Sequence, residues 1–226
     1  METEEIKIFK GIQSSLGGHS STMVPIVGMA ATLPGNALYR GSLTPVDGCR
    51  LIGEDRWDPD LFVKLTGDRA VRFAGIIDNV SLFDPEAFWI ADKEAILMDP
   101  QQRLVLETVA ESMAQFSNKL RFDSCGTFVG CSSHDYLKMS LAVTGITAYT
   151  GTGTSSSVVS GRLSYTFGFQ GPAMTIDTAC SSSLVGMHMA FNCIDLGQCI
   201  TASGSGVNII LHPTTLATLQ KAGMLT

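Results

Sequence analysis

The sequence has little charge, no cluster of basic residues and no long apolar run. Charged residues make up 16% of the 226 positions and hydrophobic residues 45%, and the formal net charge is −6. A chain so rich in apolar residues is not disordered throughout. Nucleic acid is excluded as a partner, because phosphate binding needs clustered lysine and arginine. No stretch approaches the roughly 18 apolar residues of a membrane-spanning helix.

A secretory signal and a disulfide framework are also missing. The chain starts with the acidic run Met1–Glu5, where a signal peptide would be basic. Its six cysteines include no Cys-x-x-Cys pair. These features predict a reducing compartment, the cytoplasm. Cys131 and His134 are the nearest approach to a metal-ligand pair, and two ligands at this spacing are too few, so no metal site is predicted.

Two regions differ in character along the chain. In residues 1–22, four apolar residues recur at roughly helical spacing before a polar, glycine-containing stretch: Ile6, Phe9, Ile12 and Leu16. This pattern fits a leader that forms a short docking helix, and equally a flexible tail. Residues 23–226 form the expected globular domain. A chain of this length can bury about 70% of its surface, which is ample for a core.

Strand-like and helix-like segments alternate through this domain. Strands are expected over 24–29, 125–129, 173–178 and 207–211, with a turn at Pro34–Gly35 and a loop over 36–70. Helices are expected to begin near Phe83 and at Pro100, where Asp99 provides an N-cap, and over 155–167 and 182–196. This order predicts an α/β fold with a largely buried sheet layered with helices.

The most informative cysteine lies between the expected strand 173–178 and the expected helix 182–196. Cys180 follows small residues there and precedes Ser181 and Ser182. The start of a helix has unpaired N–H groups and the positive end of the dipole, which together favour a thiolate. Cys180 is therefore a candidate nucleophile, and its backbone N–H a candidate oxyanion donor. The alternative is a small buried apolar residue, the commonest role of free cysteine.

The residues around Cys180 resemble the active-site motif of β-ketoacyl synthases, in the form found in polyketide synthases and animal-type fatty acid synthases. The motif is Asp177-Thr178-Ala179-Cys180-Ser181-Ser182-Ser183-Leu184. Further blocks match the family in order along residues 23–226: Ile26–Ala30 with Pro34–Gly35, Asp55–Asp58, Met98–Leu104, Gly161–Tyr165, Gly171–Pro172, Gly206–Asn208 and Lys221–Leu225.

The resemblance implies a thiolase-like fold, of which the chain has the N-terminal half with its mixed sheet, and a homodimer. It implies that Cys180 takes an acyl group from the phosphopantetheine thioester of an acyl carrier protein. Decarboxylative Claisen condensation with a malonyl-type extender follows. The chain itself is expected to bind no cofactor, since the phosphopantetheine belongs to the carrier.

The sequence also departs from the family. The two histidines of the condensation step lie in the family's C-terminal half, which is therefore an expected partner. None of the four histidines at 19, 134, 188 and 212 replaces them. His188 lies eight residues after Cys180, or roughly 12 Å along a helix, and is expected to be packed. His212 is expected to have a turn role.

Trp89 and residues 91–93 replace a small residue and a Ser-Pro-Arg of the family. Because the two histidines of the condensation step are missing, acyl loading on Cys180 is expected without condensation. The alternative function is a non-catalytic half-domain that acts in dimerisation or assembly.

Overall fold

A three-stranded parallel sheet forms the centre of the molecule. The computed structural model describes residues 23–38, 47–54, 56–67, 71–115 and 122–225, so the expected leader over 1–22 lies outside the described residues. Strand β5 (Cys125–Cys131) runs between β6 (Ala173–Ile176) and β7 (Thr201–Val207), parallel to both. All seven residues of β5 are buried. This is the expected result for a central strand covered on both faces.

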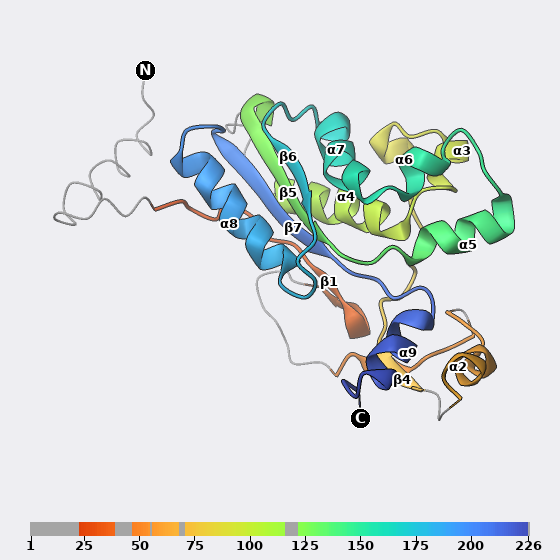
Figure 1. Ribbon diagram of the computed structural model, residues 1–226. Helices are drawn as coiled ribbons and strands as arrows, with labels where there is room; N and C mark the ends of the chain where they lie inside the picture. The colour runs from red at the N-terminus through yellow and green to blue at the C-terminus, as the bar shows by residue number, and fades with distance from the viewer. Residues whose placement is uncertain (1–22, 39–46, 55, 68–70, 116–121, 226) are drawn as a thin grey trace, which may run out of the picture.

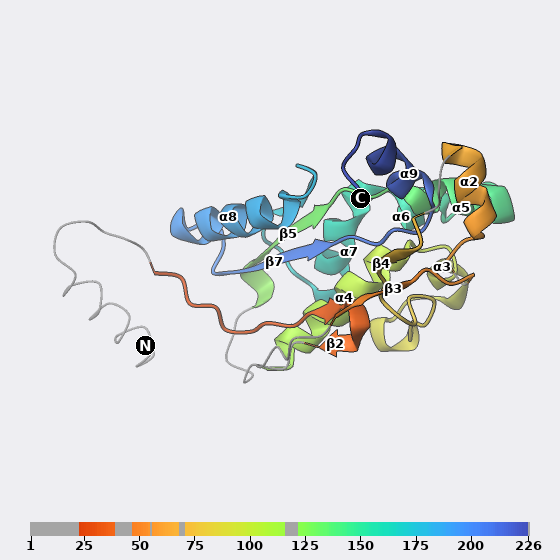
Figure 2. The same ribbon diagram turned by 90° about the horizontal axis from the view of Figure 1, so that it is seen from below.

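Helices cover the two faces of this sheet. Helix α8 (Ser182–Asp195) lies on one face, and α4 (Pro100–Met113) and α7 (Ser156–Phe167) lie on the other (Figures 1 and 2). The α4 and α7 side has a core of large apolar residues that includes Met98, Leu106, Val129 and Leu163. The prediction of an α/β fold with a buried, helix-layered sheet is confirmed.

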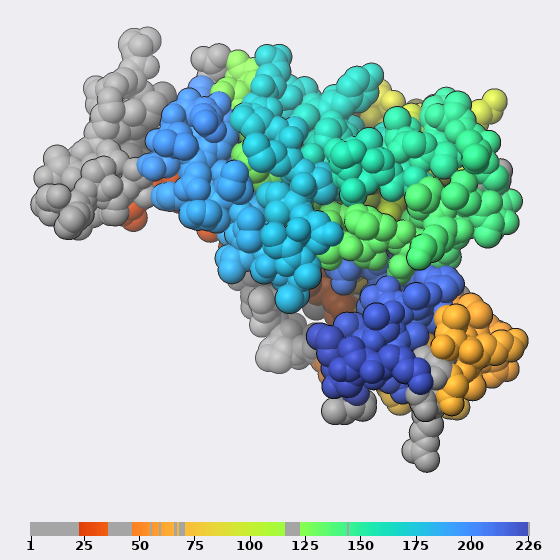
Figure 3. All heavy atoms as spheres, viewed as in Figure 1, coloured from red at the N-terminus to blue at the C-terminus, as the bar shows by residue number. Residues whose placement is uncertain are grey.

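A second, smaller core lies below the sheet. Here the antiparallel pair β3 (Cys49–Leu51) and β4 (Phe73–Gly75) packs with α2 (Pro59–Thr66) and α9 (Thr214–Lys221). Figure 3 shows α2 and α9 side by side. The buried members of the core include Ile52, Trp57, Phe62, Ile76 and Leu216.

The predicted loop over 36–70 is wrong where α2 lies. Asp58 accepts a hydrogen bond from Asp60 N at 2.8 Å, and Pro59 is the first helical residue. Gly67 ends the helix in the left-handed conformation, with φ of 66°. Each of these is an ordinary helix-boundary signal. The helix is only eight residues long and lies within a longer segment that has no regular apolar period.

Short elements complete the chain. They are β1 (Thr32–Leu33), η1 (Pro34–Asn36), β2 (Ala37–Leu38), η2 (Glu86–Phe88), α3 (Asp92–Ala95), η3 (Phe122–Ser124), α5 (Asp135–Thr144) and α6 (Thr150–Thr154). The turn at Pro34–Gly35 is confirmed, since it joins the paired strands β1 and β2. Within the described ranges, no helix has the length and apolar character needed to cross a membrane.

The predicted strand over 24–29 is wrong. The segment is irregular, and Ile26, Val27 and Met29 are exposed. Met29 bonds to a side chain instead of a strand: its N–H donates to Gln115 Oε1 at 3.2 Å, and its carbonyl accepts from Gln115 Nε2 at 2.6 Å. A side-chain amide can satisfy one residue in this way, whereas a strand needs a neighbouring backbone.

The last predicted strand is displaced. The strand is β7, over Thr201–Val207, and residues 208–211 after it are irregular. The apolar run 207–211 was the stronger sequence signal. Small residues, including Gly204 and Gly206, form the strand instead, because α8 lies too close to β7 for larger side chains. The predicted start at Pro100 and the helices over 155–167 and 182–196 are confirmed to within one residue.

Candidate active site

Cys180 lies where the three parallel strands end. Ile176, the last residue of β6, pairs with Gly130 of β5, which pairs with Gly206 of β7. Three residues follow Ile176 before Cys180, and α8 begins two residues later at Ser182. The cysteine therefore occupies the strand-to-helix turn predicted from the sequence. Its side chain is exposed in this part of the domain.

A left-handed residue shapes this turn. Ala179 has φ of 56°, a conformation that costs an L-residue about 1 kcal/mol or more. The carboxylate of Asp177 accepts a hydrogen bond from Ala179 N at 3.0 Å. The Ser182 hydroxyl accepts from Thr178 N at 2.8 Å and donates to Ala179 O at 2.6 Å. These bonds hold the backbone on both sides of the strained residue.

A second serine supports the same turn from the helix side. The Ser181 hydroxyl donates to Thr178 O at 2.8 Å and lies 2.9 Å from Thr178 Oγ1. Ser181 is exposed whereas Ser182 is 5% exposed. The hydroxyls of the two residues that follow Cys180 therefore both hydrogen-bond to the turn, Ser181 from the surface and Ser182 from beneath it.

Two glycines allow the helix start to reach the sheet. A Cβ added at Gly130 would lie 2.4 Å from Ser183 N, and one at Gly206 would lie 2.4 Å from Ser183 Cβ. Both distances are too short for any side chain, so the first turn of α8 sits directly on β5 and β7. This close contact fixes the height of Cys180 above the ends of the strands.

The sequence reasoning did not find these two glycines as part of the site. The sequence shows a glycine before the cysteine motif, Gly130, and one after it, Gly206. It does not show that these two glycines pair across β5 and β7 beneath the start of α8, which only the strand register reveals.

The other cysteine at this end of the sheet differs from Cys180. Cys131 ends β5 and is 2% exposed. Burial raises the pKa of its thiol to about 11, and the negative charges of Asp99 and Asp177 act in the same direction. A thiol with so high a pKa stays protonated near neutral pH, so it reacts much more slowly than an exposed thiolate.

The described histidines do not reach the nucleophile as partners. His188 is exposed on α8, and its Nε2 lies 3.0 Å from Asn192 Nδ2, so the prediction that it is packed is wrong. The packed face of α8 consists of Ser182, Gly186, Ala190 and Cys193 instead. Large apolar residues such as Leu184 and Met187 are exposed. A helix pressed against glycine-containing strands buries its small residues.

His134 and His212 have local roles. His134 precedes α5 and is exposed, and no group of three or more metal-binding side chains gathers anywhere in the described chain. His212 Nδ1 accepts from Thr214 N at 3.3 Å and lies 2.6 Å from Thr214 Oγ1, which agrees with the turn role expected for it. His19 lies outside the described residues.

The block Met98–Leu104 connects the loops at this end of the sheet. Asp99 caps α4 by accepting from Gln101 N at 2.8 Å, and burial raises the pKa of its carboxyl group. Gln101, 1% exposed, donates to Ser133 O at 2.9 Å and accepts from Ile209 N at 3.3 Å. One buried amide thus joins the loops that follow β5 and β7.

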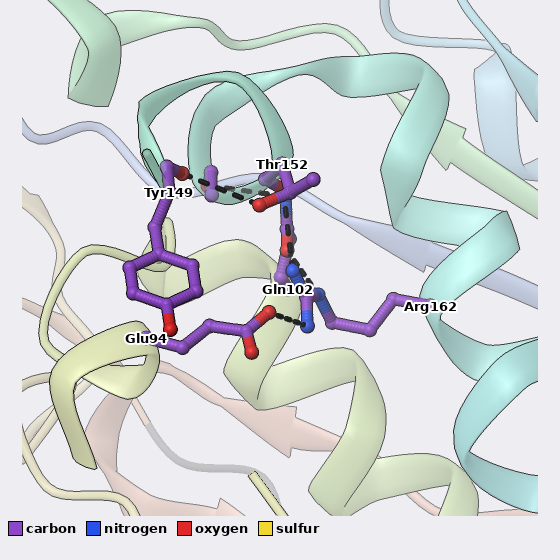
Figure 4. A network of polar contacts seen from close by, with 6 residues as sticks. Glu94, Gln102, Tyr149, Thr152 and Arg162 are labelled. Carbon is purple, nitrogen blue, oxygen red and sulfur yellow. Dashed lines mark hydrogen bonds and ion pairs between the residues drawn. The ribbon is translucent and has the colours of Figure 1, made fainter. Parts of the chain in front are cut away.

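The block Gly161–Tyr165 meets the same helix through Arg162 (Figure 4). The guanidinium, 9% exposed, donates to Gln102 Oε1 at 2.6 Å and to Glu94 Oε1 at 2.7 Å. It also donates to Thr152 O at 3.3 Å, while Gln102 Nε2 donates to the same carbonyl at 3.1 Å. The two blocks therefore form a buried polar network that holds α3, α4, α6 and α7 together.

Comparison with known proteins gives one consistent result. The model of the β-ketoacyl synthase N-terminal domain matches residues 21–226. The spectinabilin polyketide synthase system protein NorA′ of Streptomyces orinoci is 39% identical over 217 residues, which are 89% of this chain and 6% of the relative. The pikromycin polyketide synthase component PikAII of Streptomyces venezuelae is 37% identical over 238 residues, which are 97% of this chain and 6% of the relative.

Solved structures give the same answer for the fold. The oxazolomycin ketosynthase domain of Streptomyces albus matches with a TM-score of 0.74 and 32% identity, over 88% of this chain and 36% of that one. The ketosynthase from module 6 of the bacillaene synthase of Bacillus subtilis matches with a TM-score of 0.73 and 31% identity, over 89% of this chain and 34% of that one. The chain thus spans about a third of the length of these ketosynthases.

The family match, the relatives and the ketosynthase fold agree with the position of the cysteine motif at the ends of the strands. The chain belongs to the β-ketoacyl synthase family, as an N-terminal domain of the polyketide synthase type.

Proposed function

We propose that Cys180 is the acyl-accepting nucleophile of a polyketide ketosynthase, and that residues 23–226 form the part of the domain that positions it. The observation that carries this proposal is the placement of an exposed thiol at the start of the 14-residue helix α8, after a strained and hydrogen-bonded turn. Strain held by specific hydrogen bonds is common where a side chain must be presented for reaction.

The first chemical step is transthioesterification. The Cys180 thiolate attacks the carbonyl carbon of an acyl thioester carried on the phosphopantetheine of an acyl carrier protein. The Cys180 N–H is the proposed donor to the oxyanion that develops. The carbon–sulfur bond to phosphopantetheine then breaks, its thiol leaves, and the acyl group stays on Cys180.

Condensation needs further groups. The family resemblance places two histidines in the C-terminal half of the domain, beyond the region that the N-terminal model matches. We propose that these histidines, supplied from outside residues 23–226, act with Cys180 in decarboxylation of a malonyl-type extender and in carbon–carbon bond formation. The acyl carrier protein, the C-terminal half and a second copy of the domain are the proposed partners.

Competitive thiol labelling tests the nucleophile directly. Cys49 is the matched control, because it is also exposed but lies on strand β3 rather than at a helix start. Iodoacetamide should modify Cys180 at least about ten times faster than Cys49 near neutral pH. An acyl thioester of N-acetylcysteamine should add its acyl group to Cys180, and C180S should lose this addition whereas C49S keeps it. Equal labelling rates with no acyl transfer would favour the non-catalytic assembly module.

A further inference from the structure

A second group of thiols lies at the far end of α8 from Cys180. Cys193, in the last turn of α8, and Cys199, just before β7, are 2% and 4% exposed. Their sulfur atoms are 2.7 Å apart. They belong to a small core with Phe128 and Ala190 and have no part in the proposed acyl transfer.

The backbone and the sheet hold these two cysteines together. Cys193 O accepts hydrogen bonds from Gln198 N at 2.9 Å and from Cys199 N at 3.3 Å. Gly197 turns the chain between them, with φ of 67°. Both sulfurs lie over Gly126 of β5, where an added Cβ would be 3.3 Å from Cys199 Sγ and 3.5 Å from Cys193 Sγ. The pair is therefore fixed by the helix end, the connecting loop and the strand beneath.

We propose that Cys193 and Cys199 are a covalent modification site, at which hydrogen peroxide converts the dithiol to a disulfide that ties the end of α8 to the start of β7. The site is separate from Cys180, and the proposal does not depend on the acyl transfer proposed above.

The chemistry balances in two steps. The sulfur of one cysteine attacks an oxygen of the peroxide, the O–O bond breaks, and a sulfenic acid and one water form. The second thiol then displaces the hydroxyl group from that sulfur, giving the S–S bond and a second water. Two thiols are oxidised and one peroxide is reduced. The short distance between the two sulfurs favours this second step, because the attacking thiol already lies beside the sulfenic acid.

The protonation state of the pair sets how easily it reacts. Burial raises the pKa of Cys199 to about 12, with the neighbouring thiols of Cys193 and Cys125 acting in the same direction. The dithiol is accordingly expected to survive mild oxidants that modify an exposed thiolate, and to be oxidised at higher peroxide exposure.

Peptide mapping of the full chain tests the proposal. The protein is treated with hydrogen peroxide, unfolded in the presence of N-ethylmaleimide so that every remaining thiol is blocked, and cleaved on the N-terminal side of aspartates. Cleavage at Asp177 and Asp195 places Cys193 in peptide 177–194 and Cys199 in peptide 195–226. We expect the two peptides to be joined, with two hydrogens fewer than their summed mass, and to separate on reduction.

Variants assign the bond. Because peptide 177–194 also holds Cys180, C180S should keep the cross-link. C199S should lose it, and C125S, which removes the third thiol of the group, should keep it. Recovery of Cys193 and Cys199 as unlinked N-ethylmaleimide adducts or as sulfinic acids, after Cys49 has been fully oxidised, would overturn the proposal. A link from either residue to Cys125 or Cys180 would also overturn it. The map of the unmutated chain decides the question even if a variant does not fold.

Discussion

The two ends of helix α8 hold cysteines in opposite environments. At the N-terminal end, Cys180 is exposed on a strained turn, and the helix backbone rests on Gly130 and Gly206. At the C-terminal end, Cys193 and Cys199 are buried side by side over Gly126. One thiol is therefore exposed to solvent at the start of this helix, and two others are buried at its end. The position of each cysteine in the sequence does not indicate whether it is exposed or buried. The packing of the backbone at each end of the helix decides this.

The largest effect is expected from a substitution that breaks the contact between the sheet and the N-terminal end of α8. In G130A the new Cβ would meet the backbone of Ser182 and Ser183 at 2.5 and 2.4 Å, and neither backbone can yield. We expect the free energy of unfolding to fall by about 4 kcal/mol, beyond ordinary overpacking. Labelling of Cys180 should lose its rate advantage over Cys49. Urea unfolding and competitive labelling measure the two effects.

Gly126 supplies the matched control at the other end of the same strand. In G126A the nearest atoms, at 2.9 and 3.3 Å, belong to the side chains of Phe128 and Cys199, which can shift. The loss of stability should be smaller than in G130A, and Cys180 should keep its labelling rate. If G130A and G126A lose the same free energy of unfolding, then the close contact between the backbones of helix and sheet is not confined to the start of α8.

The buried thiols should make the protein sensitive to alkali. The pKa values of Cys131 and Cys199 are raised from 9.0 to about 11 and about 12, because burial disfavours their thiolates. Both thiols stabilise the folded state fully below about pH 9. That contribution is lost as the pH rises from about 9, where the thiols of the unfolded chain ionise, to the folded-state values. From neutral pH to about pH 10 the two together should lose about 3 kcal/mol of unfolding free energy.

Urea unfolding at a series of pH values measures this loss. C49S, which removes an exposed thiol, should show the same alkaline loss as the unmutated chain. C131S should show about half of it. A pH dependence unchanged in C131S would contradict the assignment to buried thiols.

A smaller effect concerns the hydroxyl that holds the turn. S182A removes the bonds to Thr178 N and Ala179 O, and should lower the free energy of unfolding by about 1–2 kcal/mol. Labelling of Cys180 should slow, because its backbone is less restrained. S183A, at the next position, is the control: it keeps the Cβ that lies against Gly206 and removes only the hydroxyl of an exposed residue, so it should change neither quantity by a comparable amount. Cysteine labelling unchanged in S182A would show that Ser182 supports the fold without positioning Cys180.

The smallest effect compares two left-handed residues. Ala179 and Trp89 have φ of 56° and 54°, and glycine would relieve either by about 1 kcal/mol. W89G should only raise the melting temperature, since Trp89 is 87% exposed at the end of η2. A179G should relieve strain as well but slow the labelling of Cys180, because glycine also widens the range of turn conformations. If Cys180 is labelled at the same rate in both variants, the strain at Ala179 does not contribute to the reactivity of Cys180.

Local signals in the sequence were sufficient for several elements. Asp99 and Pro100 mark the start of α4, and the alternation of segments indicated the layered sheet. The same local reasoning failed for 24–29 and for 208–211, where apolar residues resemble a strand but the described backbone is irregular. It also missed α2, although Asp58, Pro59 and Gly67 mark its boundaries. Pairing partners are distant in sequence, so apolar character alone does not identify a strand.

By itself, the sequence determined the family, the order of strands and helices through the centre of the chain, and the identity of the candidate nucleophile. A specific motif, a capping residue and the alternation of segments are local properties, because each depends on residues that are neighbours in the sequence. Only the tertiary structure decided which cysteines are exposed, which glycines support the helix start, and that Cys193 meets Cys199. These depend on the register of β5 against its neighbours and on how closely α8 approaches them, and both arise from contacts between distant residues.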